Sequence, residues 1–298
     1  MARGDDGGGA DHRRVIDDRV KYLSFVWTDM AHVARLRCYP VKGFDAESVD
    51  SIRMTDAGSV AGDREFALCD PTLVDVENPK DGPDHAYNGK QLPRIHELRT
   101  RYDPVDGVLE VTPPDGGALS FDLPADNEAA EEWFGAFFDV DVTLLRSEPP
   151  AFVDRPAMGP SVISTATLTE VASWFDDLSV ESVRRRMRAN VEIDGVPAFW
   201  EDRFVGDDSP GFVAGGVRFE GVEPCARCVV PTRDPETGDS LEGFRERFLE
   251  YREATFPEWA DRDAFDHLYT LMLIAAVPES DRGGTVSVGD VVDVVDEG

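Results

Sequence analysis

The first half of the chain is a series of short segments in which apolar and polar residues alternate. Residues 31–39 (AHVARLRCY) alternate as a half-buried strand does. Further segments of strand-like length and character lie at residues 48–54, 65–69, 95–102, 108–111 and 119–123. Turn signals separate several of them: Gly62-Asp63, Asp106-Gly107 and Asp115-Gly116-Gly117. The pattern predicts a small β-barrel or sandwich over residues 31–125.

A helical pattern follows the predicted strands. Residues 127–138 place four aromatic side chains on one face, with Asp126 before them as a candidate N-cap. Prolines and glycines then gather between residues 148 and 160, which is typical of a linker or of a loop over a cleft. We therefore expect residues 126–159 to connect the first unit to a second one.

The second half of the chain mixes strand and helix periodicities. Strand patterns lie at residues 161–164, 190–193, 217–222 and 286–295, and helical patterns at residues 167–178, 241–253 and 263–267. We expect a second unit at residues 160–296, in a protein that is mainly β with α/β features. Residues 1–30 are rich in Gly, Asp and Arg and weakly periodic, so two interpretations stay open: a disordered arm, or an upstream extension of a gene whose working start is Met30.

The chain is strongly acidic, with 60 Asp and Glu residues against 30 Lys and Arg among its 298 residues and a formal net charge of −30. Such a surface repels the phosphates of nucleic acids and of anionic membranes, so we expect neither as a partner. The acidic residues are interspersed with apolar ones, which favours a folded protein from a halophilic source. The acidic run at residues 75–84 is interpreted as solvated, in preference to a divalent-ion site.

Four cysteines, Cys38, Cys69, Cys225 and Cys228, are too few and too unevenly spaced for a disulfide framework. Their number fits a reducing cytosol. No segment approaches the roughly 18 apolar residues of a membrane span, and residues 20–27 are too short and polar for a signal core. We therefore expect a cytoplasmic protein.

Two of these cysteines flank a cation in the segment Cys225-Ala226-Arg227-Cys228. A neighbouring cation favours the thiolate, which bonds soft metals and attacks electrophiles. Four interpretations stay open: a redox pair of the thioredoxin type, half of a zinc site, inert thiols, or one metal-ligating thiolate. The prolines and glycine of residues 231–238 disfavour the redox pair because they indicate an extended loop. Zinc lacks further ligands because the histidines are dispersed, at positions 12, 32, 85, 96 and 267.

Several cations stand out in so acidic a chain. Lys42 follows a predicted strand, Arg64 follows a glycine turn, and residues 183–190 (VRRRMRAN) hold four arginines. Arginine forks bind phosphate in a bidentate manner, and the amide of Asn190 suits the edge of a heterocycle, so an anionic cofactor is one interpretation. The alternative is solvated loop cations, together with a helix end whose arginines pair with surface carboxylates.

Common enzyme fingerprints are missing from the sequence. It has no G-x-S-x-G elbow, no Walker-type phosphate loop and no G-x-G-x-x-G fingerprint. Asp234 and Glu201 are candidate proton relays, although structural roles are the better interpretation of both.

Four pieces in order resemble the MOSC family: Tyr39-Pro40-Val41-Lys42, Gly62-Asp63-Arg64, Arg188-Ala189-Asn190, and Cys225-Ala226-Arg227-Cys228 with Asp234-Pro235-Glu236-Thr237-Gly238. The resemblance extends over residues 31–296. It is greatest to proteins with an amino-terminal β-barrel before the MOSC domain, the group of the mitochondrial amidoxime-reducing component and its bacterial relatives. It implies an amino-terminal β-barrel at residues 31–125 and a MOSC β-barrel at residues 160–296.

The resemblance also implies the molybdenum cofactor, a pterin dithiolene with a terminal phosphate, and reduction of N-hydroxylated small molecules. Cys228 matches the cysteine that ligates molybdenum, with Cys225 and Arg227 beside it. The pterin and its phosphate would be held by residues from several motifs, Lys42, Arg64, Arg188 and Asn190, with Ser164 and Thr165 less securely matched. Gly43 and Ala189 depart from the family pattern, in which a polar residue and a proline are common.

Two functions follow from the resemblance. One is a molybdenum-dependent oxidoreductase that receives electrons from a separate donor of flavoprotein, ferredoxin or cytochrome type, since the chain ends soon after Val295 without a ferredoxin-like extension. The other is a carrier or binding module for the molybdenum cofactor or its sulfur, without turnover of a substrate.

Overall fold

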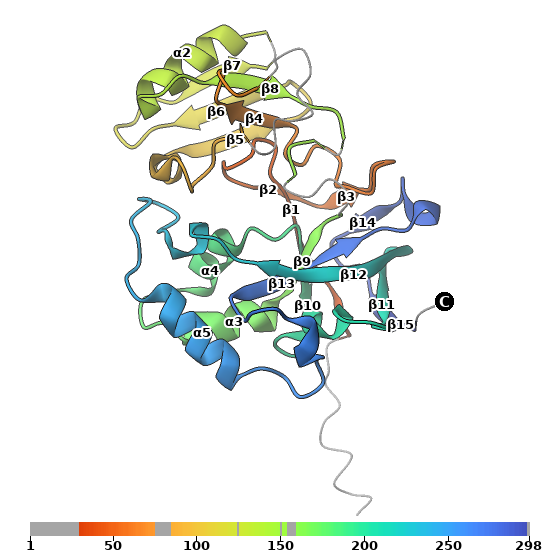
Figure 1. Ribbon diagram of the computed structural model, residues 1–298. Helices are drawn as coiled ribbons and strands as arrows, with labels where there is room; N and C mark the ends of the chain where they lie inside the picture. Colours follow the sequence, from red (N-terminus) through yellow and green to blue (C-terminus); the bar gives the residue numbers. More distant parts are fainter. Residues whose placement is uncertain (1–29, 75–84, 124, 150, 154–158, 297–298) are drawn as a thin grey trace, which may run out of the picture.

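The computed structural model describes residues 30–74, 85–123, 125–149, 151–153 and 159–296. These residues form a mainly β protein with two packed parts, as the alternating segments predict (Figure 1). Helix α2 and strands β4–β8 lie in one part, and strands β9–β15 with helices α3–α5 form the other. The expected arm at residues 1–30 falls, apart from Met30, outside the described residues, as does the acidic run at residues 75–84.

An eight-stranded sheet organises the carboxyl-terminal part. Its strands lie in the order β15-β11-β12-β13-β9-β10-β1-β2, and only the β9–β10 pair is parallel. The strands are β1 (His32–Cys38), β2 (Glu47–Val49), β9 (Ser161–Ser164), β10 (Val191–Asp194), β11 (Gly211–Ala214), β12 (Val217–Ala226), β13 (Thr270–Ala276) and β15 (Val292–Val295).

The first strands of the described residues are thus built into the carboxyl-terminal part. Strand β1 pairs with β10, and β3 (Ser51–Arg53) pairs with β14 (Thr285–Ser287). Val33 and Met54, both fully buried, pack in one apolar cluster with residues of β9–β13. The expected division into residues 31–125 and 160–296 therefore does not coincide with the division of the cores, because β1 needs the edge of β10 to satisfy its backbone.

The amino-terminal part has its own core. It contains a three-stranded sheet, β5 (Arg99–Asp103), β6 (Val108–Thr112) and β7 (Leu119–Asp122), and the pair β4 (Phe66–Cys69) and β8 (Thr143–Arg146). Helix α2 (Asn127–Phe138) covers them and buries Phe134, which lies 5.3 Å from Phe44 between ring centroids. The helix expected as a connector is therefore part of this core, since its aromatic face is too apolar to remain in water.

Three helices accompany the large sheet, α3 (Thr165–Ser173), α4 (Val180–Met187) and α5 (Phe244–Ala254). Ser164 caps α3 and Ser179 caps α4, each by accepting a backbone N–H from the first turn. Arg188 ends α4 in the left-handed conformation, with φ of 62°. The described residues also contain short 3-10 helices: η3 (Pro93–Glu97), η4 (Trp200–Phe204), η5 (Val230–Thr232), η6 (Arg262–Ala264) and η7 (Glu279–Asp281).

The periodicity predicted some elements to the residue and misjudged others. The bounds of α2 and β9 match the predictions at residues 127–138 and 161–164. The segments 48–54 and 286–295 each hold two short strands, and residues 95–97 lie in η3. Helix α3 ends at Ser173, short of the predicted residue 178, and residues 265–267 lie outside η6. The strands and α-helices that were missed are β8, β11, β13 and α4, and the 3-10 helices η4, η5 and η7 were not predicted either.

None of the helices in the described ranges is both long and apolar enough to cross a membrane.

Candidate functional site

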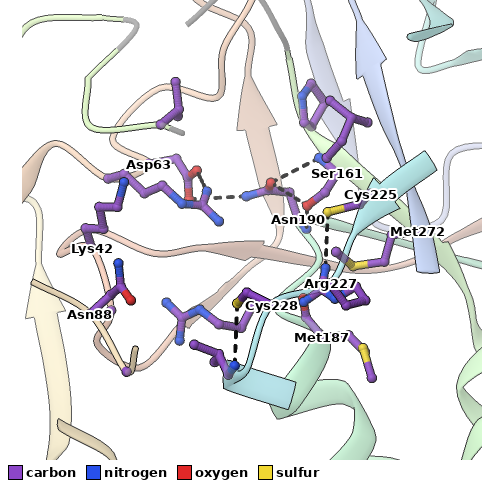
Figure 2. A pocket seen from close by; sticks show the side chains of 18 of the residues that line it. Lys42, Asp63, Asn88, Ser161, Met187, Asn190, Cys225, Arg227, Cys228 and Met272 are labelled. Atoms are coloured by element: carbon purple, nitrogen blue, oxygen red, sulfur yellow. Dashed lines mark hydrogen bonds and ion pairs between the residues drawn. The ribbon is translucent and has the colours of Figure 1, made fainter. Parts of the chain in front are cut away.

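A cavity of about 420 Å³ opens between the two parts. Its walls come from the loop after β1, the turn at residues 59–64, the loop at residues 88–90, the end of α4, and the end of β12. Figure 2 shows Lys42, Asp63 and Asn88 on one side of the space and Cys225, Arg227 and Cys228 on the other. This volume lies in the range of small-molecule sites, roughly 300–1,000 Å³.

The cavity gathers seven of the nine residues that the sequence indicated: Lys42, Arg64, Arg188, Asn190, Cys225, Arg227 and Cys228. Ser164 and Thr165 are not among the lining residues. Ser164 is fully buried as the cap of α3, and the Thr165 hydroxyl lies 3.1 Å from Glu192 Oε1. Their hydroxyls serve the fold at the β9–α3 junction.

The charge of the wall is opposite to that of the whole chain. Among the described lining residues the cations are Lys42, Arg64, Lys90, Arg188 and Arg227, and the only carboxylate is Asp63. A chain with a net charge of −30 has thus placed five cations around one cavity. Cations gathered around one cavity repel one another, which costs free energy unless an anion lies between them. The cavity is therefore suited to an anionic ligand.

Arg188 is the member of the arginine cluster that faces the cavity. Its guanidinium lies 4.2 Å from the centre of the Tyr39 ring. Within the described part of the chain no side chain or carbonyl accepts a hydrogen bond from it. Burial lowers the pKa of Arg188, although a guanidinium stays charged near neutral pH. Its donors are therefore available to a ligand.

The other three arginines of the cluster serve the protein itself. Arg184 binds Glu192 through Nε and Nη2 at 2.7 and 2.9 Å. Arg185 donates to Pro235 and Glu236, and Arg186 donates to the Pro231 carbonyl at 3.0 Å and to that of Arg233. Each of the three also pairs with a carboxylate at the surface, Glu181, Glu236 and Asp234 respectively, so the interpretation as a helix end with ion pairs fits these three arginines.

Asn190 and Asp63 form a buried brace at the back of the cavity. Asn190 accepts two hydrogen bonds from Ser161, at 3.0 and 3.2 Å, and donates to Arg37 O and Asp63 Oδ1, both at 3.2 Å. Asp63 also accepts from the Tyr39 N–H at 2.8 Å and from the Arg64 guanidinium. All the donor and acceptor positions of the Asn190 amide are used, so it positions Asp63 and Arg64 instead of offering its edge to a heterocycle.

The loop at residues 233–238 holds the opposite wall. Arg233 donates from Nε to Gly89 O at 2.8 Å and from Nη1 to Gly238 O at 3.1 Å. Asp234 accepts the N–H groups of Glu236 and Thr237 and closes a turn. The motif thus ties the carboxyl-terminal part to the loop that carries Asn88 and Lys90.

Replacing Gly238 with alanine is expected to push the loop at residues 233–238 away from Pro93. Gly238 has φ of +75°, and an added Cβ would collide with the carbonyl group of Pro93. Gly216 has a similar φ of +81° but open space around it, so Gly216→Ala isolates the backbone strain. We expect the free energy of unfolding to fall by about 1 kcal/mol for Gly216→Ala and by about 2–3 kcal/mol for Gly238→Ala. Urea unfolding measures both, and equal losses would contradict the role of the Pro93 contact.

Comparison with models of known protein families shows to which family the chain belongs. The model of the MOSC N-terminal beta barrel domain matches residues 30–181, more than half of the sequence, and the MOSC domain model matches residues 159–293. The chain belongs to the MOSC family. MOSC domains are associated with proteins that bind or sulfurate the molybdenum cofactor.

Among solved structures, the crystal structure of the YUAD protein from Bacillus subtilis is similar over 90% of this chain and 97% of its own, with 13% sequence identity and a TM-score of 0.37. No curated protein matches the chain.

In this MOSC protein the two cavity cysteines have different surroundings. Cys228 Sγ accepts the backbone N–H of Val230 at 3.4 Å, and its carbonyl accepts the Tyr269 hydroxyl at 3.3 Å. Cys225 Sγ receives Arg227 Nη1 at 3.1 Å, while Arg227 Nη2 donates to Met187 O at 3.2 Å. Both thiols are free and partly exposed. The cation beside the pair therefore engages Cys225, whereas Cys228 lines the cavity and its sulfur has, within the described ranges, a backbone N–H as its one donor.

The local backbone argues against a redox pair and a zinc site. Cys225 lies on β12, and Arg227 continues the pairing by donating its N–H to Tyr269 O, so the segment is extended instead of opening a helix. No group of three His, Cys, Asp or Glu side chains in the described residues is arranged to hold a metal ion. The other two thiols are inert: burial first, with neighbouring carboxylates, raises the pKa of Cys38 far above its usual range, and burial raises that of Cys69 to about 12.

His96 is a wall residue that the sequence indicated only as one of five dispersed histidines. Burial, and then the positive charges of Arg188 and Arg233, lower its pKa to about 4. The ring is therefore neutral near pH 7, and its Nε2 has no hydrogen-bond partner among the described residues. Other missed wall residues are Asn88, Lys90, Met187 and Met272. The Asn88-Gly89 turn was the one signal that could have indicated the first two.

Proposed function

We propose that this MOSC protein binds the molybdenum cofactor in the cavity, with the Cys228 thiolate as the protein ligand of the metal, and that it reduces N-hydroxylated small molecules. Electrons would come from a separate donor protein of flavoprotein, ferredoxin or cytochrome type. The observation that carries the proposal is the meeting, in one cavity, of Cys228 with cations from both parts of the chain.

The donor set of the cavity fits the cofactor. A dithiolene-bound metal is soft, and a cysteine thiolate is a soft ligand. The cofactor's phosphate needs charge-assisted donors, which Arg188 offers without competing partners in the described residues. Arg227 Nε is buried without a hydrogen-bond partner there, so an acceptor from a ligand would satisfy it.

The charged and amide side chains of the wall would then bind or position the cofactor. Lys42, whose ammonium donates to Phe152 O at 2.9 Å, and Arg64, anchored on Asp63, add fixed positive charge near the ligand's anionic end. Arg227 fixes Cys225 and Met187, and Asn190 braces Asp63. When bound, the cofactor would supply the chemistry that removes an N-bound oxygen and releases it as water. The protein supplies binding, orientation and a positive field.

The first experiment tests cofactor binding. Protein made in a cofactor-competent host is analysed for molybdenum by elemental analysis and for pterin by the fluorescence of its oxidised form. We expect about one of each per chain, and a loss of most molybdenum in Cys228→Ala. Cys225→Ala is the matched control, since it removes a thiol three residues away that is held by Arg227. Equal molybdenum in Cys228→Ala and wild type would reject the ligand assignment.

A second measurement separates the reductase from the carrier. Loaded protein is mixed with a reduced viologen dye and an N-hydroxylated amidine, and the oxidation of the dye is followed. Turnover that depends on Cys228 supports the reductase. Full loading without turnover, with either the dye or a physiological donor, would favour a carrier of the cofactor or its sulfur.

A further inference from the structure

We propose that Tyr39 is a positioning residue that holds Arg64 and Arg188 together as a preformed clamp for the anionic end of the ligand. The identity of that anion as the cofactor's terminal phosphate rests on the proposed function. The clamp itself requires only an anion of the phosphate class.

The ring of Tyr39 contacts both guanidinium groups. Arg188 lies 4.2 Å from the ring centre and Arg64 lies 5.2 Å from it, both within the range of cation–π attraction. The two arginines come from distant parts of the chain, Arg64 from the turn before β4 and Arg188 from the end of α4. One aromatic side chain thus brings together cations that the sequence separates by more than 100 residues.

The backbone and hydroxyl of Tyr39 also form hydrogen bonds with the segments that carry Arg64 and Arg188. Its N–H donates to Asp63 Oδ1 at 2.8 Å, and its carbonyl accepts the Arg64 N–H at 2.6 Å. Its hydroxyl donates to Ala189 O, next to Arg188, at 3.3 Å. Arg64 and Arg188 both have positive φ, at 55° and 62°, a conformation that costs about 1 kcal/mol each for such residues and needs support from neighbours. Tyr39 touches the segments of both.

Packing alone does not explain this tyrosine. Tyr39 is only 2% exposed, yet it belongs to none of the apolar clusters formed by the described residues. Burial lowers the pKa of Arg188, and the charge of Arg64 lowers it further, as expected for neighbouring cations. The aromatic ring offsets part of that repulsion, and a bound dianion would offset the rest.

The test uses cofactor-free protein with inorganic pyrophosphate as the probe, measured by titration calorimetry. Tyr39→Phe keeps the ring and loses the bond to Ala189, whereas Tyr39→Leu and Tyr39→Met keep apolar volume without the ring. We expect Tyr39→Phe to bind within about twofold of wild type and the other two to bind about tenfold more weakly, as loss of roughly 1.4 kcal/mol of cation–π attraction implies. Thermal melts report folding independently, and Tyr39→Met serves where Tyr39→Leu does not fold.

Rescue by phenylalanine distinguishes positioning from general stability. The proposal is overturned if Tyr39→Met binds pyrophosphate as tightly as wild type, if Tyr39→Phe loses as much affinity as Tyr39→Met, or if wild type does not bind the probe. Because this titration involves no molybdenum, a protein that binds pyrophosphate through Tyr39 yet never acquires molybdenum would reject the proposed function and leave the clamp standing.

Discussion

Arg188→Gln is expected to lower the affinity of the cofactor-free protein for inorganic pyrophosphate by about 100-fold. Arg188 lines the cavity, and its guanidinium has no hydrogen-bond acceptor among the described residues. A bidentate contact with phosphate replaces two such missing partners, and two charge-assisted hydrogen bonds contribute about 3 kcal/mol together. Glutamine keeps some polarity but loses the charge and the fork. Titration calorimetry at fixed ionic strength measures the change.

Arg247→Gln is the matched control for this prediction. Arg247 lies on α5, where it pairs with Asp176 at 3.5 Å and is 44% exposed, so its loss changes the net charge equally without touching the cavity. We expect its affinity to stay within about twofold of wild type. Equal losses in both variants would show that pyrophosphate responds to overall charge, and Arg188 would then have no specific role.

Glu201→Gln is expected to remove a pH dependence of folding and to stabilise the protein in mild alkali. Glu201 is 1% exposed, in η4, and does not line the cavity. Burial, with the charge of Asp202 adding to it, raises its pKa from 4.5 to about 7. Its position argues for a structural carboxyl and against the proton relay. Asp234, held by Arg186 and by its own turn, is likewise outside the cavity wall.

The sign of the effect follows from proton counting. Between pH 4.5 and 7 the native state holds the Glu201 proton more often than the unfolded state, so the free energy of unfolding falls as pH rises through this window. About 2.5 pKa units correspond to about 3 kcal/mol at most. We expect wild type to lose up to this amount between pH 5 and pH 8 and Glu201→Gln to lose much less.

Urea unfolding at several pH values measures the slope directly. Glu250→Gln, on the exposed face of α5, removes one negative charge without changing the interior. It should retain the wild-type slope. A Glu201→Gln slope equal to that of wild type would assign the pH dependence to other carboxyl groups.

Local sequence patterns predicted the helices and strands that have a clear apolar segment or face with polar or turn residues at its ends. Helix α2 has a continuous aromatic face, and β9 is a short apolar run bounded by a proline and a capping serine, so their bounds were correct. Strand β13 (TLMLIAA) was missed, since an apolar run buried on both sides has no alternation to distinguish it. Strand β1 pairs with β10, which lies more than 100 residues later, and no local pattern in the sequence indicates such a pairing.

The sequence indicated seven residues of the cavity wall, and the tertiary structure changed the roles of several residues near them. Arg184, Arg185, Arg186 and Arg188 look equivalent in the sequence, but helical geometry sends successive residues in different directions and only Arg188 meets the cavity. The sequence indicated Asn190 as a cofactor contact, but its side-chain amide makes four hydrogen bonds to Ser161, Arg37 and Asp63.

By itself, the sequence determined which chemical groups this protein possesses: two cysteines beside an arginine, a cluster of four arginines in an acidic chain, and mainly β segments. These depend on composition and short-range spacing. Only the tertiary structure decided which groups are satisfied internally and which remain available to a ligand, because partners such as Asp63 for Asn190 and Gly89 for Arg233 come from distant parts of the chain. Tyr39 shows this most directly, since its role exists only where Arg64 and Arg188 meet over its ring.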